Sequence, residues 1–184
     1  MSAERPGGHK YARIEYERRF LLSELPAQID PETGYKRIID VYIDGTRLRR
    51  RSMYSPAGEL LTSKFTQKYA APGQPPTETT ITNLYLNETE AAMIESLPGL
   101  TLTKRRYPYP SNGVTYSLDT FEGPLAGLVL AEVEALSAEQ IDSMPIPTLA
   151  LREVTAEPAF TGGVLVRLSR SECERLLSRE LSDA

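Results

Sequence analysis

Same-sign charges recur at alternate positions in several short segments of this 184-residue chain. They form two acidic pairs and two basic sets: Glu15/Glu17, Glu132/Glu134, Arg47/Arg49/Arg51 and Lys104/Arg106. In a β-strand, positions i and i+2 point to the same face, so each set would gather like charges on one side of a strand. Like charges at that spacing repel each other, and this pattern constrains how the strands can be arranged.

Two arrangements can accommodate these faces. Taken one strand at a time, each face reads as the solvent side of a half-exposed antiparallel sheet. A surface selected for stability alone would, however, tend to mix signs along each strand. Separate acidic and basic strands instead favour a closed sheet whose interior is wet and charged. The outer face would then be the apolar one, covered by helices.

The pattern of turns and alternation predicts an antiparallel, mainly β architecture with a few helices. Strands are expected near 12–20, 38–51, 59–69, 78–86, 102–108, 114–121 and 128–135. Helices are expected at 91–97 after an Asn87 N-cap, at 137–144 with a Ser137 cap and Gln140 at the capping-box position, and at 169–181. Residues 1–10, rich in Gly, Pro and charge, are interpreted as a loose arm, and 11–184 as one domain with a C-terminal helix.

The composition excludes several classes of function. A net charge of -4 gives no global attraction to nucleic acid or to anionic membranes. The arginines from 47 to 51 do not form a nucleic-acid patch, because Arg50 lies on the opposite face and the acidic pairs would repel a backbone. Cys173 is the sole cysteine, which rules out an intrachain disulfide, and no apolar run approaches the roughly 18 residues of a membrane span. A cytoplasmic location is the expectation.

A lumen lined with both signs suits one kind of ligand. Clustered carboxylates bind hard cations such as Mg²⁺ or Mn²⁺. Arginine and lysine bind phosphate oxygens. Phosphoryl transfer needs mainly positioning and charge neutralisation, so such a site needs no Ser, His or Cys nucleophile. The expected ligand is a small polyphosphate held with divalent metal.

The order of the charged strands resembles the CYTH superfamily, the triphosphate tunnel metalloenzymes. The run from Glu15 to Arg19 is similar to the family's opening Glu-x-Glu-x-Lys. The later motifs follow in order along residues 10–168: Arg47-Leu48-Arg49, Thr62-Ser63-Lys64, Glu78, Lys104-Arg105-Arg106, Asp119, and Glu132-Val133-Glu134. Each motif alone is weak, and the ordered set is specific.

The resemblance implies an eight-stranded antiparallel β-barrel that forms a tunnel. It assigns metal ligation to Glu15, Glu17, Glu78, Asp119, Glu132 and Glu134, for Mg²⁺ or Mn²⁺. It assigns phosphate binding to Arg19, Arg47, Arg49, Lys64, Lys104 and Arg106, and catalytic roles to Glu17, Glu134 and Arg19. The implied reaction is metal-dependent hydrolysis of a triphosphate, with inorganic triphosphate favoured over thiamine or nucleoside triphosphate.

Two departures from the family pattern leave other functions open. Position 19 is Arg where the signature has Lys, and residues 159–163 carry no base where relatives usually supply another Lys. The alternatives are a class IV adenylate cyclase and a polyphosphate- or nucleotide-binding module without catalysis. A homodimer also stays open.

Overall fold

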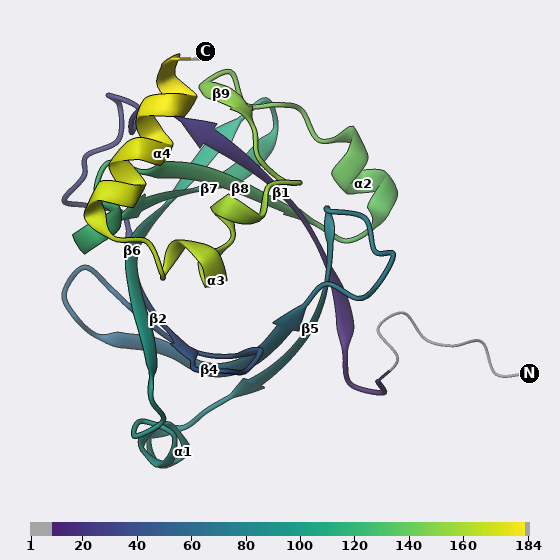
Figure 1. Cartoon of the computed structure of the whole chain (residues 1–184), viewed down its shortest axis with the longest axis vertical. Coiled ribbons are helices and arrows are strands. Elements are labelled where there is room, and N and C mark those ends of the chain that lie inside the picture. Colours follow the sequence, from purple (N-terminus) through teal and green to yellow (C-terminus); the bar gives the residue numbers. More distant parts are fainter. Residues whose placement is uncertain (1–8, 183–184) are drawn as a thin grey trace, which may run out of the picture.

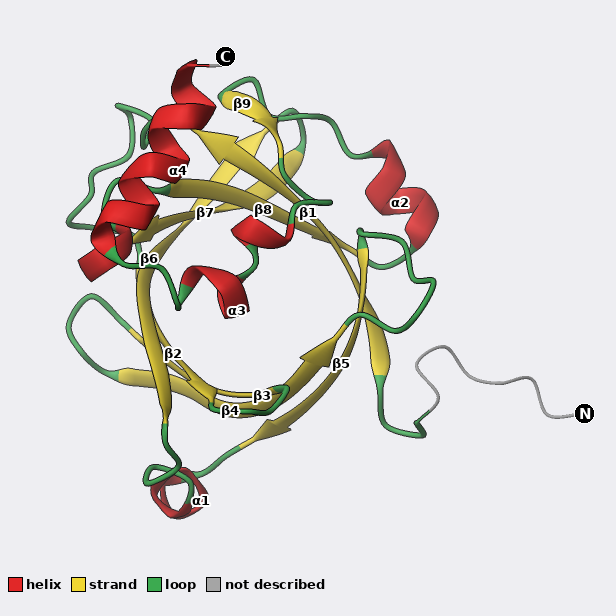
Figure 2. Ribbon diagram, in the orientation of Figure 1, coloured by secondary structure: helices red, strands yellow, loops and turns green. Residues whose placement is uncertain are grey.

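The strands of the chain form a closed barrel in the computed structural model, which describes residues 9–182. Within those residues the strands are β1 (Arg13–Leu22), β2 (Lys36–Ile43), β3 (Leu48–Tyr54), β4 (Leu60–Tyr69), β5 (Glu78–Tyr85), β6 (Gly99–Ser111), β7 (Val114–Phe121), β8 (Val129–Ala135) and β9 (Ala150–Glu153). Neighbours run antiparallel in the order β5-β4-β3-β2-β6-β7-β8-β1-β9. A second pairing of β5 with β1 closes the ring of β1 to β8, as Figures 1 and 2 show.

The expected eight-stranded antiparallel barrel is therefore confirmed. β9 was not expected. It pairs with Phe20 to Leu22 of β1, beyond the residues of β1 that pair with β5. No helix of the described residues is long and apolar enough to cross a membrane.

The expected single strand at 38–51 is wrong. The structure has two strands, β2 and β3, joined by a turn in which Gly45 has a φ of 68°. This left-handed conformation suits glycine because it lacks a Cβ. Asp44-Gly45 is a hairpin signal that the alternating pattern on both sides concealed. The hairpin places Asp40 directly opposite Arg51.

The helices lie outside or at one end of the barrel. They are α1 (Glu88–Met93), α2 (Ala138–Ser143), α3 (Gly162–Leu165) and α4 (Arg170–Ser182), with 3₁₀ turns η1 (Gly123–Leu125) and η2 (Pro158–Phe160). The Asn87 and Ser137 caps are confirmed, and Asn87 forms a full capping box with Glu90. The expected end of the first helix at 97 is wrong, since α1 stops at Met93. Most of the expected arm at 1–10 lies outside the described residues.

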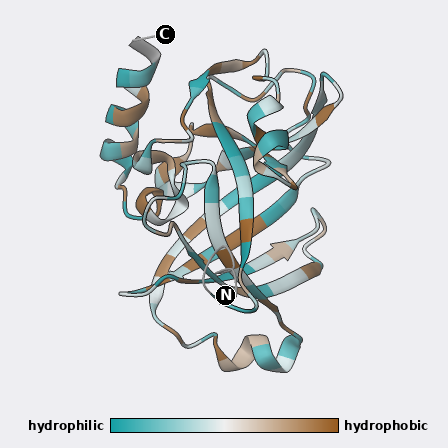
Figure 3. Cartoon of the chain, turned by 90° about the vertical axis from the view of Figure 1, so that its right-hand side faces the viewer, coloured by the Kyte–Doolittle hydropathy of each residue, from teal (hydrophilic) through white to brown (hydrophobic). Residues whose placement is uncertain are grey.

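The outer face of half the barrel carries one hydrophobic core. Phe20, Tyr116 and Leu118 are fully buried there, and Ile141 of α2 packs against them. Figure 3 shows hydrophilic and hydrophobic residues succeeding one another along the strands, as a sheet with two different faces requires. The expected apolar outer face with a helix over it is confirmed for this half.

A second core fills one end of the lumen. Leu21 and Leu130 lie on the same strand faces as the charges of β1 and β8, and they pack with Phe160 of η2 and Leu165 of α3. Figure 2 shows α3 lying across the opening of the barrel, with α4 beside it. The segment 158–165, which includes the base-free stretch 159–163, is thus a helical plug, a name used below for these residues.

The plug fits closely against β2. A Cβ built on Gly162 would lie 1.9 Å from the Tyr42 hydroxyl oxygen, whereas one built on Gly163 would lie 3.9 Å from the nearest Tyr42 atom. The two glycines are neighbours in α3, so they differ mainly in this contact.

Gly162→Ala should therefore destabilise the fold and Gly163→Ala should not. Forcing a methyl group against the rigid tyrosine costs about 1–3 kcal/mol, while alanine in a helix gains roughly 0.5–1 kcal/mol over glycine. Urea unfolding of both variants measures the difference in the free energy of unfolding. Equal free energies for the two variants would contradict the close fit of the plug.

Candidate functional site

The lumen beside the plug collects most of the charged residues expected from the sequence. Cross-strand pairs share a face, so the registers fix which side chains point inward. Glu17 lies opposite Glu134, and Arg19 lies opposite Glu132. The structure brings together Glu15, Glu17, Arg19, Arg49, Lys64, Lys104, Arg106, Asp119, Glu132 and Glu134.

Asp119 is the centre of one charge cluster. Its side chain is fully buried and accepts two hydrogen bonds from Arg106, at 2.7 and 2.6 Å, and one from Lys104. Arg106 also donates to Glu132. Burial alone would raise the pKa of Glu132, but Arg106 and Lys104 hold it well below its usual value. Glu132 therefore stays ionised.

Asp40 is the centre of a second cluster, and the sequence reading missed it. It is 1% exposed and accepts two hydrogen bonds of 2.7 Å from Arg51. The Nε of Arg49 lies 3.5 Å from it. Burial raises the pKa of Asp40, but the two guanidinium groups outweigh this and keep it well below its usual value. The Asp44-Gly45 turn was the available signal, because it sets Asp40 opposite Arg51.

Lys64 lies close to two arginines, whose charges outweigh those of Glu15 and Glu134. Arg51 lies directly opposite it, and no carboxylate comes within ion-pair distance of it among residues 9–182. Burial, followed by the charges of Arg51 and Arg49, lowers the pKa of Lys64 to about 8. Arg49 is also incompletely hydrogen-bonded, because its Nε is buried without a hydrogen-bond partner. A bound anion would compensate the charge of Lys64 and accept a hydrogen bond from the Nε of Arg49.

The acidic residues gather around Lys68 of β4, also missed from the sequence. The Nζ of Lys68 lies 2.5 Å from Glu15 and 3.5 Å from Glu17. Lys68 is four residues after Lys64 and so shares its inward face, which was the available signal. Glu134 makes no ion pair with the described residues. Although Glu134 keeps solvent access, partial burial and then Glu15 and Glu17 raise its pKa.

Arg19 faces the lumen but is engaged with the plug. Its two terminal nitrogens donate to the backbone oxygens of Phe160, at 3.1 Å, and Thr155, at 3.2 Å. Its Nε lies 3.3 Å from Glu17 but is buried without a well-formed hydrogen bond. The structure thus places Arg19 as a link between β1 and the plug.

Two expected site residues do not join the others. Glu78 pairs with Tyr16, so it lies on the face opposite to Glu15 and Glu17. A displacement of one residue reverses the face of a strand position, and this is why its place in the family order was misleading. Arg47 precedes β3, is exposed, and stacks on the ring of Tyr69 at 4.1 Å.

The carboxylates that could bind a metal ion are Glu15, Glu17 and Glu134, which are called the acidic end of the lumen below. No three acidic, His or Cys side chains of residues 9–182 converge into a ready-made metal cage. Glu17 and Glu134 nevertheless face each other, with Glu15 nearby, and partial burial followed by the repulsion of Glu15 and Glu17 raises the pKa of Glu134. A divalent cation would relieve this repulsion, and carboxylate oxygens are the ligands that Mg²⁺ and Mn²⁺ prefer. The donor set fits such an ion.

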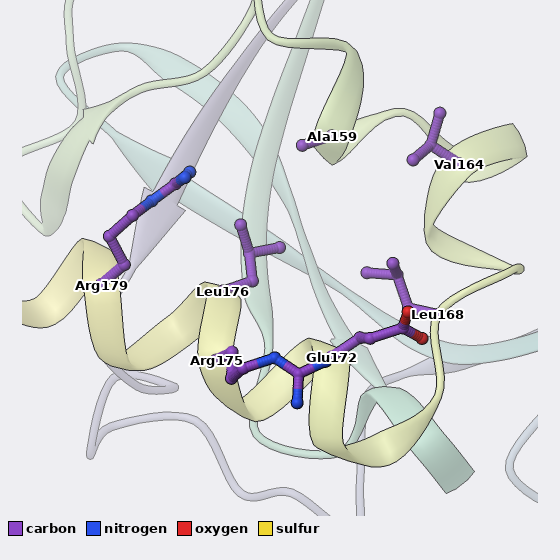
Figure 4. Close-up of a pocket in the computed structure, with 7 residues that line it drawn as sticks. All are labelled: Ala159, Val164, Leu168, Glu172, Arg175, Leu176 and Arg179. Carbon is purple, nitrogen blue, oxygen red and sulfur yellow. The ribbon is translucent and has the colours of Figure 1, made fainter.

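A surface hollow of about 340 Å³ lies apart from the lumen, against α4 (Figure 4). Val164, Leu168 and Leu176 supply its apolar lining. Its acidic residue, Glu172, bonds to Ser169 at the start of α4. Arg175 and Arg179 also line the hollow, but it lacks the clustered carboxylates of the lumen, so the lumen is the candidate site.

The fold has counterparts among solved structures. Two crystal structures of the protein NE1496, one of them described as an inorganic triphosphatase, match with TM-scores of 0.54 and 0.52 at 23% identity. They cover 84% and 83% of this chain and 99% and 93% of theirs. The PH1012 protein from Pyrococcus horikoshii OT3 matches with a TM-score of 0.46 at 16% identity, covering 86% and 93%. No family model and no curated protein matches the chain. The likeness to the two NE1496 structures agrees with the expected antiparallel barrel fold.

Lys64 should cost the protein stability at neutral pH. Its folded pKa of about 8 lies below the unfolded value of 10.5, so the penalty is complete below pH 8. Between pH 8 and 10.5 the unfolded chain binds more protons, and stability rises with pH.

Lys64→Met should accordingly be more stable than the wild type at pH 7, and the difference should shrink by pH 9.5. Urea unfolding of both proteins at the two pH values measures it. A constant difference, or a less stable variant at pH 7, would contradict the electrostatic environment described for Lys64.

Proposed function

We propose that the protein hydrolyses a triphosphate inside the barrel with the help of a divalent metal ion, and that inorganic triphosphate is its favoured substrate. The observation that carries this proposal is the division of the lumen into two ends. At one end, Lys64 has no carboxylate at ion-pair distance among residues 9–182, and the Nε of Arg49 lacks a hydrogen bond. At the other end, Glu15 and Glu17 add to the effect of burial and raise the pKa of Glu134. A metal-bound polyphosphate chain supplies the opposite charge to both.

The basic residues would bind the phosphates. Arg49 and Lys64 have the least compensated charge, and they lie beside Arg51. Lys104 and Arg106, which are held by Asp119, face the same lumen. Arginine can donate two parallel hydrogen bonds to phosphate oxygens, and lysine acts as a compact charge. Asp40 and Asp119 fix the directions of these donors before a ligand enters.

The acidic residues would hold the metal ion and receive a proton. Glu17 and Glu134 are the proposed ligands, with Glu15 and Glu132 close to them. A bound divalent ion supplies charge neutralisation and an activated water molecule. The water oxygen attacks the terminal phosphorus, and the bond to the leaving diphosphate breaks. Glu134, which faces Glu17 and makes no ion pair with the described residues, would accept the proton that the water loses.

The solved structure of an inorganic triphosphatase with this fold supports hydrolysis as the reaction. Arg19, expected to be catalytic, has one donor committed to Phe160 of the plug and another to the backbone of Thr155, so we assign it a positioning role. Adenylate cyclase activity and binding without turnover remain as distinct outcomes of the test.

The decisive experiment incubates the protein with triphosphate, ATP and thiamine triphosphate, each with Mg²⁺ or Mn²⁺, and identifies the products. We expect orthophosphate and diphosphate from triphosphate, and loss of about 100-fold or more of this activity in Glu134→Gln, because the amide cannot accept the proton. Cyclic AMP from ATP would instead show a cyclase. Binding of triphosphate without any product would reduce the protein to a binding module.

Arg49→Ala should mainly raise the triphosphate concentration required, by roughly 10- to 100-fold, since one charge-assisted contact is worth about 1.5–3 kcal/mol. The barrel should remain folded because Arg51 still pairs with Asp40. Arg50→Ala is the matched control, as Arg50 points outward and donates to the backbone of Ile94. Steady-state kinetics give KM and kcat for both variants. Equal KM values in the two variants would remove Arg49 from the binding site.

A further inference from the structure

Lys68 lies inside the acidic end of the lumen, where the proposed function needs a metal ion. Its Nζ contacts Glu15 at 2.5 Å and Glu17 at 3.5 Å. Among residues 9–182, Lys68 is the lysine that lies within ion-pair distance of these two carboxylates. A protonated amine and a divalent cation seek the same carboxylate oxygens, so they cannot both have full access to them.

The contrast with Lys64 shows that the position of Lys68 is specific. Both lysines come from β4 and face inward, and they are four residues apart. Lys64 lies among arginines, and its charge is disfavoured. Lys68 lies among glutamates, whose charges outweigh the effect of burial and raise its pKa. Lys68 is therefore a permanent cation at neutral pH, held where negative charge has accumulated.

The other carboxylates of the lumen have different partners. Asp40 pairs with arginines of β3, while Asp119 and Glu132 pair with basic residues of β6. Glu15 is left with Lys68 as its ion-pair partner within residues 9–182. Displacing Lys68 would expose Glu15 and free one side of Glu17, next to Glu134.

We infer that Lys68 is a resident counter-cation that competes with a divalent metal ion for Glu15 and Glu17, and thereby sets the metal concentration that the site requires. The inference rests on the proposed function for the presence of a metal. The ammonium group of Lys68 can move away from the two carboxylates, because the side chain is 31% exposed and carries this group on a flexible four-carbon stem. Until a metal ion binds, Lys68 would compensate the negative charge of Glu15 and Glu17.

The test titrates the metal-free protein with Mn²⁺. Calorimetry measures the Mn²⁺ affinity, and the midpoint of thermal unfolding measures stability with and without the metal. Lys68→Met should bind Mn²⁺ at least 10-fold more tightly than the wild type. Its unfolding midpoint should be lower without metal, and Mn²⁺ should raise that midpoint by more than in the wild type. Lys68→Arg, which keeps the charge, should resemble the wild type.

Lys10→Met is the control for net charge, because it removes one exposed positive charge near Tyr11, outside the lumen. It should leave Mn²⁺ affinity unchanged. Equal or weaker Mn²⁺ binding by Lys68→Met, or weaker triphosphate binding with unchanged Mn²⁺ affinity, would overturn the inference while leaving the proposed function intact. Absence of Mn²⁺ binding in every protein, even with triphosphate present, would instead overturn the metal-dependent function.

Discussion

Charge compensation between neighbouring strands is the constraint on which this barrel depends. Asp40 and Asp119 are almost completely inaccessible to solvent, and an isolated buried carboxylate would be prohibitively costly. Each is therefore held by two basic residues of an adjacent strand. Removing one partner of such a pair leaves a buried charge, which costs far more than the pair contributes. The registers of β2 with β3 and of β6 with β7 are thus tied to the charge pattern.

The part of the lumen next to the plug is apolar, whereas the rest of the lumen is charged. At the plug, the inward positions of β1 and β8 change from charged to apolar at Leu21 and Leu130, and Phe160 and Leu165 fill the space. Arg19 lies at this boundary and donates to the backbone of Phe160 in the plug and of Thr155 before it. The backbone oxygens of a helical turn need donors, and an arginine can supply several in fixed directions. One side chain thereby connects the charged lumen to the part of the fold that closes it.

The sequence predicted the features that depend on alternation. The inward faces of β1, β6 and β8 follow from period-two spacing, and the family order supplied closure into a barrel. The errors arose where a single residue decides the geometry. Gly45 ends β2 and creates the pair between Asp40 and Arg51, while one step along β5 turns Glu78 away. The plug could not be foreseen, because 158–165 carries neither a long periodic pattern nor a charge signal.

Lys64 and Lys68 show why the tertiary arrangement, and not the residue type, determines what a charged lumen binds. Nothing local distinguishes them, since both are inward lysines of one strand. The barrel places arginines around the first and glutamates around the second, and their pKa values move in opposite directions. Lys64 lacks a carboxylate at ion-pair distance among residues 9–182, whereas Glu15 is paired with the amine of Lys68, which we infer to be displaceable. A ligand that carries phosphates at one end and a bound cation at the other satisfies both ends at once, whereas a simple anion or a free metal ion satisfies one.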